Sequence, residues 1–289
     1  MKNLPWIGLG LLGFLVISTQ FPPSAEIVEA AGQYFSTEEI QQGRSFALQR
    51  RWIFWANAIA QLALLVYLVF TPLGKRLYLA TGAIVHGHWL AHLVLLGGAY
   101  YFASAAIAFP FRLAGYFISS HWELTTQSLG SWLSDYVTGL LVMGAFEAIV
   151  IVGFYAIVRL FPGFWWLVGG AASVVLGFVV ALVLPAAIDP LFNTFTPINQ
   201  TEHKKLEPRI RAMGQRVGAS AANIYVADAS RQTTASNAYF TGFGNTQRIV
   251  LYDNLLNKHS PDEVESVIAH EMAHWWHQHI FQGILIAGA

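Results

Sequence analysis

Long apolar stretches without any charged side chain constrain the fold of this chain more than any other feature. Residues 52–74 carry no charge, and residues 77–111 and 160–188 stay uncharged over 35 and 29 positions. One helix crosses the apolar core of a bilayer with about 20 residues. The sequence therefore predicts a mainly α-helical, multispanning membrane protein.

Two further stretches bring the expected number of transmembrane helices before residue 190 to about five. One lies between Asp135 and Arg159, and the other runs from Leu4 to Phe21. The second stretch fits either a first transmembrane helix or a cleaved secretory signal peptide, because both begin with an apolar segment behind a positive charge. Both interpretations stay open.

The stretch 77–111 is too long for one upright crossing. It contains Gly97, Gly98 and Pro110, residues that interrupt or kink helices. We therefore count it once, as a tilted or broken helix.

The composition excludes several classes of protein and of metal site. Hydrophobic residues make up 55% of the chain and charged residues 11%, whereas soluble domains average about 25% charged. Sixteen basic residues balance sixteen acidic ones, so the chain has no net charge to attract nucleic acid. Cysteine is absent, so any metal ion must be held by His, Asp or Glu.

The composition changes after Asp189, and most remaining charges lie in residues 199–262. We expect a transmembrane domain over 1–190, a small extramembrane α+β domain over 191–260, and, over 261–289, a helix that runs into a truncated sixth span. Within the middle part we expect an amphipathic helix over 201–217 and strands over 224–228, 236–241 and 248–252, the last two forming a β-hairpin.

The final helix has a strong start signal. Ser260 can serve as its N-cap, Pro261 suits its first position, and Glu263 completes a capping box. The sequence therefore predicts a helix that begins near Pro261.

This helix contains one motif that carries chemistry. His270 and His274 are four residues apart, so both imidazoles lie on one face and can converge on a single ion. Glu271, beside the first histidine, is placed to take a proton from an attacking water. The pattern indicates a zinc site with His270 and His274 as ligands and Glu271 as general base.

Three segments together resemble the type I CAAX prenyl endopeptidases, which are integral-membrane zinc proteases. The resemblance rests on His270-Glu-Met-Ala-His274-Trp275 with His279, on Asp189-Pro-Leu-Phe-Asn-Thr-Phe-Thr-Pro197, and on Ser236-Asn-Ala-Tyr-Phe-Thr-Gly-Phe-Gly244 followed by Arg248-Ile-Val-Leu-Tyr-Asp-Asn-Leu-Leu256. It covers residues 189–279, about a third of the chain.

The resemblance implies an intramembrane chamber closed by seven helices, with Zn²⁺ facing inward. It also implies that the substrate peptide binds as an extra strand beside the hairpin. Asn237 and Ala238 would then lie on the edge strand that pairs with the peptide backbone.

The family's third protein ligand is a Glu on a helix well downstream of the motif, and the chain ends at Ala289. We therefore expect the natural chain to continue past Ala289 and to supply that ligand there. His277 lies about 10 Å along the helix axis from His270, so one zinc ion does not reach both.

The leading hypothesis is a membrane-embedded zinc metalloendopeptidase that uses a zinc-activated water. Its substrate would be a prenylated C-terminal peptide or another membrane-bound protein. The alternative is a non-catalytic membrane scaffold or transporter-like protein that keeps the fold, since two histidines alone hold zinc weakly. We expect a multi-pass protein with its catalytic region on the cytoplasmic side.

Two other sets of polar residues lie inside apolar stretches. His86, His88 and His92 include a pair that could hold a second metal ion, but histidines that line a wet cavity or bond neighbouring helices are the favoured interpretation. Glu147 fits the wall of a polar chamber or a hydrogen bond between helices.

Overall fold

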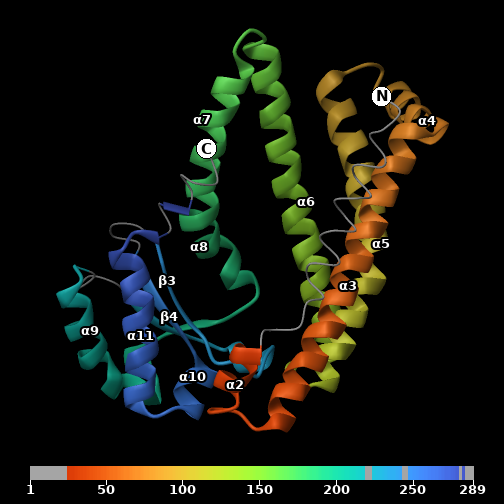
Figure 1. Cartoon of the computed structure of the whole chain (residues 1–289). Helices are drawn as coiled ribbons and strands as arrows, with labels where there is room; N and C mark the ends of the chain where they lie inside the picture. The colour runs from red at the N-terminus through yellow and green to blue at the C-terminus, as the bar shows by residue number, and fades with distance from the viewer. Residues whose placement is uncertain (1–24, 219–222, 243–246, 280–281, 284–289) are drawn as a thin grey trace. The chain divides into compact units, whose positions relative to one another are not determined.

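The computed structural model describes residues 25–218, 223–242, 247–279 and 282–283. The chain divides into two compact units. The first unit consists of Met1–Ala80 and Tyr100–Trp122, and the second unit consists of Thr81–Ala99 and Glu123–Ala289. Three of the described helices are long and apolar enough to cross a membrane, namely α3 (Thr37–Phe70), α5 (Trp89–His121) and α6 (Leu129–Leu160) (Figure 1). The expected stretch Leu4–Phe21 lies outside the described residues.

The first unit contains α2 (Ala25–Ala31), α3, most of α4 (Pro72–Ile84) and the C-terminal part of α5. A capping box starts α3, in which the Ser36 backbone N–H donates to Glu39 Oε2 at 2.8 Å. Between α3 and α5, the Ser104 hydroxyl donates to Gln61 Oε1 at 2.7 Å and Gln61 Nε2 donates to the Ser104 carbonyl at 3.0 Å. This pair satisfies two polar groups that an apolar helix interface would otherwise leave unpaired.

The stretch 77–111 is broken, as expected, but at a different place. The chain leaves the helical conformation at His86 and Gly87, whose φ angles are 51° and 74°. Gly97, Gly98 and Pro110 lie inside the continuous helix α5. Two consecutive left-handed residues cannot continue a right-handed helix, whereas a single proline removes only one backbone donor.

The second unit includes a helical hairpin. Helix α6 packs against α7 (Trp165–Phe178), which continues through a π-helical turn, η1 (Val179–Val183), into α8 (Leu184–Ile188). Within the expected apolar stretch 160–188, residues 165–188 therefore form one helical segment that ends directly before Asp189. The Arg159 guanidinium at the end of α6 lies 4.4 Å from the ring centroid of Trp89.

Among the described residues, the sheet has four strands in the order β1-β2-β4-β3. They are β1 (Phe195–Pro197), β2 (Asn223–Ala227), β4 (Arg248–Tyr252) and β3 (Ala238–Thr241). Strand β2 is parallel to β4 and antiparallel to β1, and β3 and β4 form an antiparallel pair. The three predicted strands and the hairpin pairing are confirmed, while β1 was not predicted.

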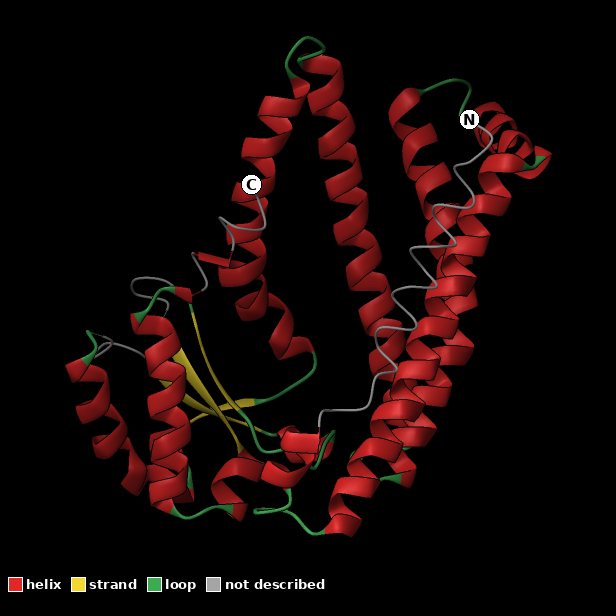
Figure 2. Cartoon of the chain, viewed as in Figure 1, coloured by secondary structure: helices red, strands yellow, loops and turns green. Residues whose placement is uncertain are grey.

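Three helices cover one face of the sheet (Figure 2). They are α9 (Glu207–Arg216), α10 (Asp253–Lys258) and α11 (Pro261–Trp276). Side chains alternate along each strand, and those on the covered face form a core with the helices. Its members include Ile224, Val226, Phe240, Ile249, Leu251, Ile210, Leu255, Val264, Ile268 and Met272.

Short 3₁₀ helices connect these elements. They are η2 (Asp189–Leu191), η3 (Ile198–Gln200), η4 (Glu202–Leu206) and η5 (Ala229–Arg231). The predicted amphipathic helix over 201–217 thus splits into η4 and α9.

Candidate active site

Helix α11 begins where the sequence predicts. Ser260 caps it, its backbone N–H donates to Glu263 Oε2 at 2.8 Å, and Glu263 N–H donates back to Ser260 Oγ at 3.4 Å. The backbone hydrogen bond from Ser260, and then the bond from its hydroxyl, hold the pKa of Glu263 below its ordinary value. The capping box therefore fixes the first turn of the motif helix.

One side of α11 is fixed against the sheet. Val264, Ile268 and Met272 are at most 2% exposed. The Trp275 ring stacks on the Phe240 ring of β3, with centroids 4.9 Å apart and planes 26° apart. Burial of this face leaves His270 and His274 on an exposed flank of the helix.

The two motif histidines converge. Their Nε2 atoms lie 3.1 Å apart, and Glu271 is half-buried beside them. Two imidazoles bound to one tetrahedral zinc at about 2.05 Å have nitrogen atoms about 3.3 Å apart. The observed separation fits two ligands of a single ion, although the described part of the chain contains no group of three side chains that could hold a metal ion.

A third imidazole contacts this pair from outside. Nδ1 of His279 lies 2.7 Å from Nδ1 of His274, so one nitrogen donates to the other. The His277 ring stacks on the His279 ring, with centroids 5.6 Å apart. Metal-binding histidines usually donate their second ring N–H to such an outer partner. Sequence reasoning noted His279 only for its place in the motif and missed this contact.

Strand β3 lies at the edge of the sheet, as expected from the resemblance. Asn237 directly precedes it and is exposed, whereas Ala238 is 3% exposed. The Tyr252 N–H donates to the Asn237 carbonyl at 3.0 Å. Because hydrogen-bonded pairs alternate along an antiparallel ladder, the N–H and C=O groups of Ala238 and Phe240 point away from β4.

The opposite face of the sheet carries a polar network. Oδ2 of Asp189 accepts from the Tyr239 hydroxyl at 2.9 Å and from Arg248 Nη2 at 3.1 Å. Burial, followed by the hydrogen bond to Asp189, raises the pKa of Tyr239 above its ordinary value. The Arg248 guanidinium also lies 5.3 Å from the centroid of the Phe195 ring. Sequence reasoning did not identify this network.

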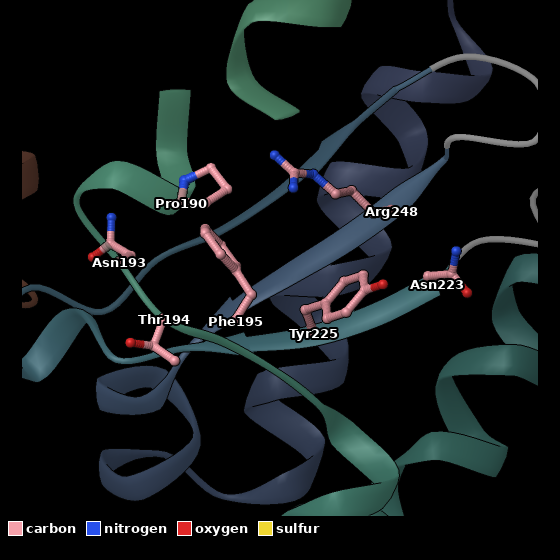
Figure 3. Close-up of a pocket in the computed structure, with 7 residues that line it drawn as sticks. All are labelled: Pro190, Asn193, Thr194, Phe195, Asn223, Tyr225 and Arg248. Carbon is pink, nitrogen blue, oxygen red and sulfur yellow. The ribbon is translucent and has the colours of Figure 1, made fainter. Parts of the chain in front are cut away.

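A pocket of about 470 Å³ opens beside this network. In Figure 3, Arg248 reaches over the sheet toward Pro190 and Phe195, and Tyr225 lies next to Asn223. Tyr225 and Arg248 alternate with the core residues Ile224 and Ile249, so the pocket lies on the face opposite α11.

Family models match nearly the whole chain. The model for the CAAX prenyl protease N-terminal region, described as five membrane helices, matches residues 18–194, and the model for peptidase family M48 matches residues 200–289. The chain belongs to peptidase family M48. The five-helix region agrees with the predicted number of spans, and the mainly helical membrane fold with a small sheet domain is confirmed.

Relatives of this M48 chain include two curated proteins. It is 36% identical over 171 residues to CAAX prenyl protease 1 of Saccharomyces cerevisiae, covering 57% of this chain and 35% of that protein. It is 30% identical over 178 residues to the uncharacterized metalloprotease YhfN of Bacillus subtilis, covering 62% of this chain and 41% of that protein. The chain thus spans less than half the length of these two relatives.

The fold of this M48 chain also matches a solved structure. The crystal structure of S. mikatae Ste24p superposes with a TM-score of 0.77 at 24% identity, covering 94% of this chain and 64% of that one. This likeness supports the fold.

The other polar residues predicted inside apolar stretches do not form a second centre in the described structure. His92 Nε2 lies 3.0 Å from Thr81 Oγ1, and His88 Nδ1 accepts from the Ala91 N–H at 3.4 Å. These contacts favour structural hydrogen bonding, and no group of three metal-binding side chains occurs among the described residues. Glu147 is exposed on α6, and its place in a chamber wall stays a prediction.

Proposed function

We propose that this M48 chain forms the membrane domain and zinc helix of a metalloendopeptidase. His270 and His274 are the two zinc ligands contributed by α11, and Glu271 is the general base. The observation that supports this most directly is the 3.1 Å separation of the two Nε2 atoms on a well-capped, well-packed helix. A third ligand, which a catalytic zinc requires, comes from outside the described residues.

The side chains then have separate tasks. His270 and His274 would hold a zinc ion, which would supply the polarisation of a peptide carbonyl and the acidification of a water molecule. Glu271 takes a proton from the attacking water and later returns it to the leaving amine nitrogen. His270 and His274 hold the ion at the side of α11, and the buried face of the helix packs α11 against β3.

The proposed substrate is a peptide at the membrane, and a prenylated C-terminal peptide is the specific candidate. The relative in Saccharomyces cerevisiae is named for action on prenylated CAAX proteins. A chain that carries both long apolar helices and a peptide-binding strand suits a substrate with a lipid on one end. We place the catalytic region on the cytoplasmic side.

A non-catalytic scaffold is the weaker alternative. It gives no reason for two imidazoles to converge at ligand distance beside a carboxylate, since exposed side chains on a helix lose rotamer freedom when held together. Membership of a peptidase family also favours the enzyme.

The experiment that tests the proposal is Glu271→Gln in the full-length protein purified in detergent. General acid–base catalysis contributes about 10²–10⁴-fold, so we expect hydrolysis of a farnesylated peptide to fall by at least about 10²-fold. Zinc content stays unchanged because both ligands remain. The matched control is Glu265→Gln on the same helix, which we expect to keep wild-type activity. Retained activity in Glu271→Gln refutes the assigned role.

The peptide-binding role of β3 has its own test. A peptide that pairs with the outward groups of Ala238 and Phe240 slows amide exchange at those two positions. The amide of Tyr239 points toward β4 and keeps its exchange rate. Equal exchange at Ala238 and Phe240 with and without bound peptide contradicts the strand-pairing proposal.

A further inference from the structure

Asp189 is the first residue after the last helix of the membrane segment. Helix α8 ends at Ile188, and Asp189 opens the short turn η2 that leads to β1. Its side chain is 29% exposed. A carboxylate in this place needs partners, because burial of a charge is costly unless hydrogen bonds compensate it.

The partners of Asp189 come from the hairpin. One carboxylate oxygen accepts from Tyr239 on β3 and from Arg248 on β4. In the ladder Arg248 faces Thr241, so Tyr239 is the diagonal neighbour two residues along the same face. Asp189 therefore bridges both strands of the hairpin to the end of α8.

The two faces of β3 contact different parts of the structure. Tyr239 points to Asp189, while its neighbour Phe240 stacks on Trp275 of α11, directly after His274. The groups proposed to pair with a peptide belong to Ala238 and Phe240, on either side of Tyr239. A substitution at Asp189 therefore affects the proposed peptide-binding edge through its contact with Tyr239 on the same strand.

The pairing of β3 alone holds this edge weakly. The strand has four residues, and β4 is its only neighbour in the described sheet. Edge strands of this length depend on side-chain contacts for their position. Charge-assisted hydrogen bonds are the strongest such contacts, and the bonds to Asp189 are of this kind.

We propose that Asp189 is a positioning residue that holds strand β3 in register for peptide binding. The inference rests on the proposed function, since it takes β3 as the strand that binds the peptide. It extends that function by giving the end of the membrane segment control over substrate affinity. Zinc binding does not depend on Asp189, because both histidines lie within one turn of α11.

The test measures peptide affinity, and Glu271→Gln serves as the background so that the peptide stays intact. The probe is a fluorescent, farnesylated decapeptide with a free C-terminal carboxylate. Loss of charge-assisted hydrogen bonds predicts a Kd about tenfold higher for Asp189→Ala. Tyr239→Phe removes one hydrogen bond and keeps the ion pair, so we expect a Kd about threefold higher. Zinc content stays at the wild-type level in both.

The matched control is Asp228→Asn, which removes the same charge from a carboxylate that holds Thr194 and Arg231. We expect its Kd to stay within about twofold of the parent. An equal loss of affinity in Asp228→Asn overturns the inference, because it reveals a general charge effect. Unchanged affinity in Asp189→Ala and Tyr239→Phe also overturns it and leaves the proposed function intact. Absence of zinc, peptide binding and hydrolysis in the wild-type protein overturns the proposed function, and this inference with it.

Discussion

The contact between His274 and His279 gives a measurable prediction about metal affinity. Replacing His279 by Ala removes the partner of His274 Nδ1, 2.7 Å away, and leaves both proposed ligands in place. The ring of His274 then loses the hydrogen bond that holds its plane while Nε2 points toward His270. We therefore expect zinc to bind more weakly.

The size of the effect follows from the exposure of this cluster. Removing an outer partner of a metal ligand typically costs 10- to 100-fold in affinity, or about 1.4–2.7 kcal/mol. Both His274 and His279 are exposed, so water replaces part of the lost hydrogen bond. We expect the lower end of this range, a zinc Kd about tenfold higher.

The assay is competition with a chromophoric chelator in detergent, supported by zinc content from elemental analysis. His277→Ala is the matched control, since it removes the same side chain from the same turn. Its ring stacks on His279, so we expect a change of less than about threefold. His279→Asn restores an acceptor and recovers part of the affinity. Equal losses in the His277 and His279 variants refute the outer-partner role.

Three predictions concern the stability of α11. Ile268→Ala truncates a side chain with 0% exposure and lowers the free energy of unfolding by about 2–5 kcal/mol in denaturant titrations, while exposed Ser266→Ala leaves it unchanged. Ser260→Ala removes the N-cap hydroxyl and costs about 1 kcal/mol in the same assay. The lowered pKa of Glu263 contributes stability above the ordinary value of 4.5, and this is lost as the pH falls below it. Acidification therefore destabilises the wild type more than Glu263→Gln, and equal acid sensitivity contradicts the capping-box role.

Local signals account for the part of the fold that was predicted. The charge-free stretches set the long helices, because a span is a property of some 20 consecutive residues. The capping box at Ser260 set the start of α11, and the spacing of His270 and His274 set their convergence. Each of these features lies within a few helical turns, where sequence and geometry are directly related.

Features that join distant residues were missed. Strand β1 has three residues and includes Pro197, so nothing in its own sequence distinguishes it from a loop; it exists because it pairs with β2. The bond from Tyr239 to Asp189 joins residues 50 positions apart. The sequence pointed to Gly97, Gly98 and Pro110 as the place of the helix break, whereas the break lies at His86. Glycine and proline content alone does not determine where φ becomes positive.

The alternation of side chains along β3 lets one strand contact two different parts of the candidate site. Successive residues of a strand face opposite sides, so Tyr239 can bind Asp189 while Phe240 stacks on Trp275. The outward backbone groups of Ala238 and Phe240 are left free of β4, and the proposed function assigns them to a peptide. A helical segment in place of β3 would offer no free backbone donors and acceptors, because it pairs them internally. Under the proposed function, a short edge strand would therefore provide at once a contact to Asp189 at the end of α8, a contact to α11, and an open edge for the peptide.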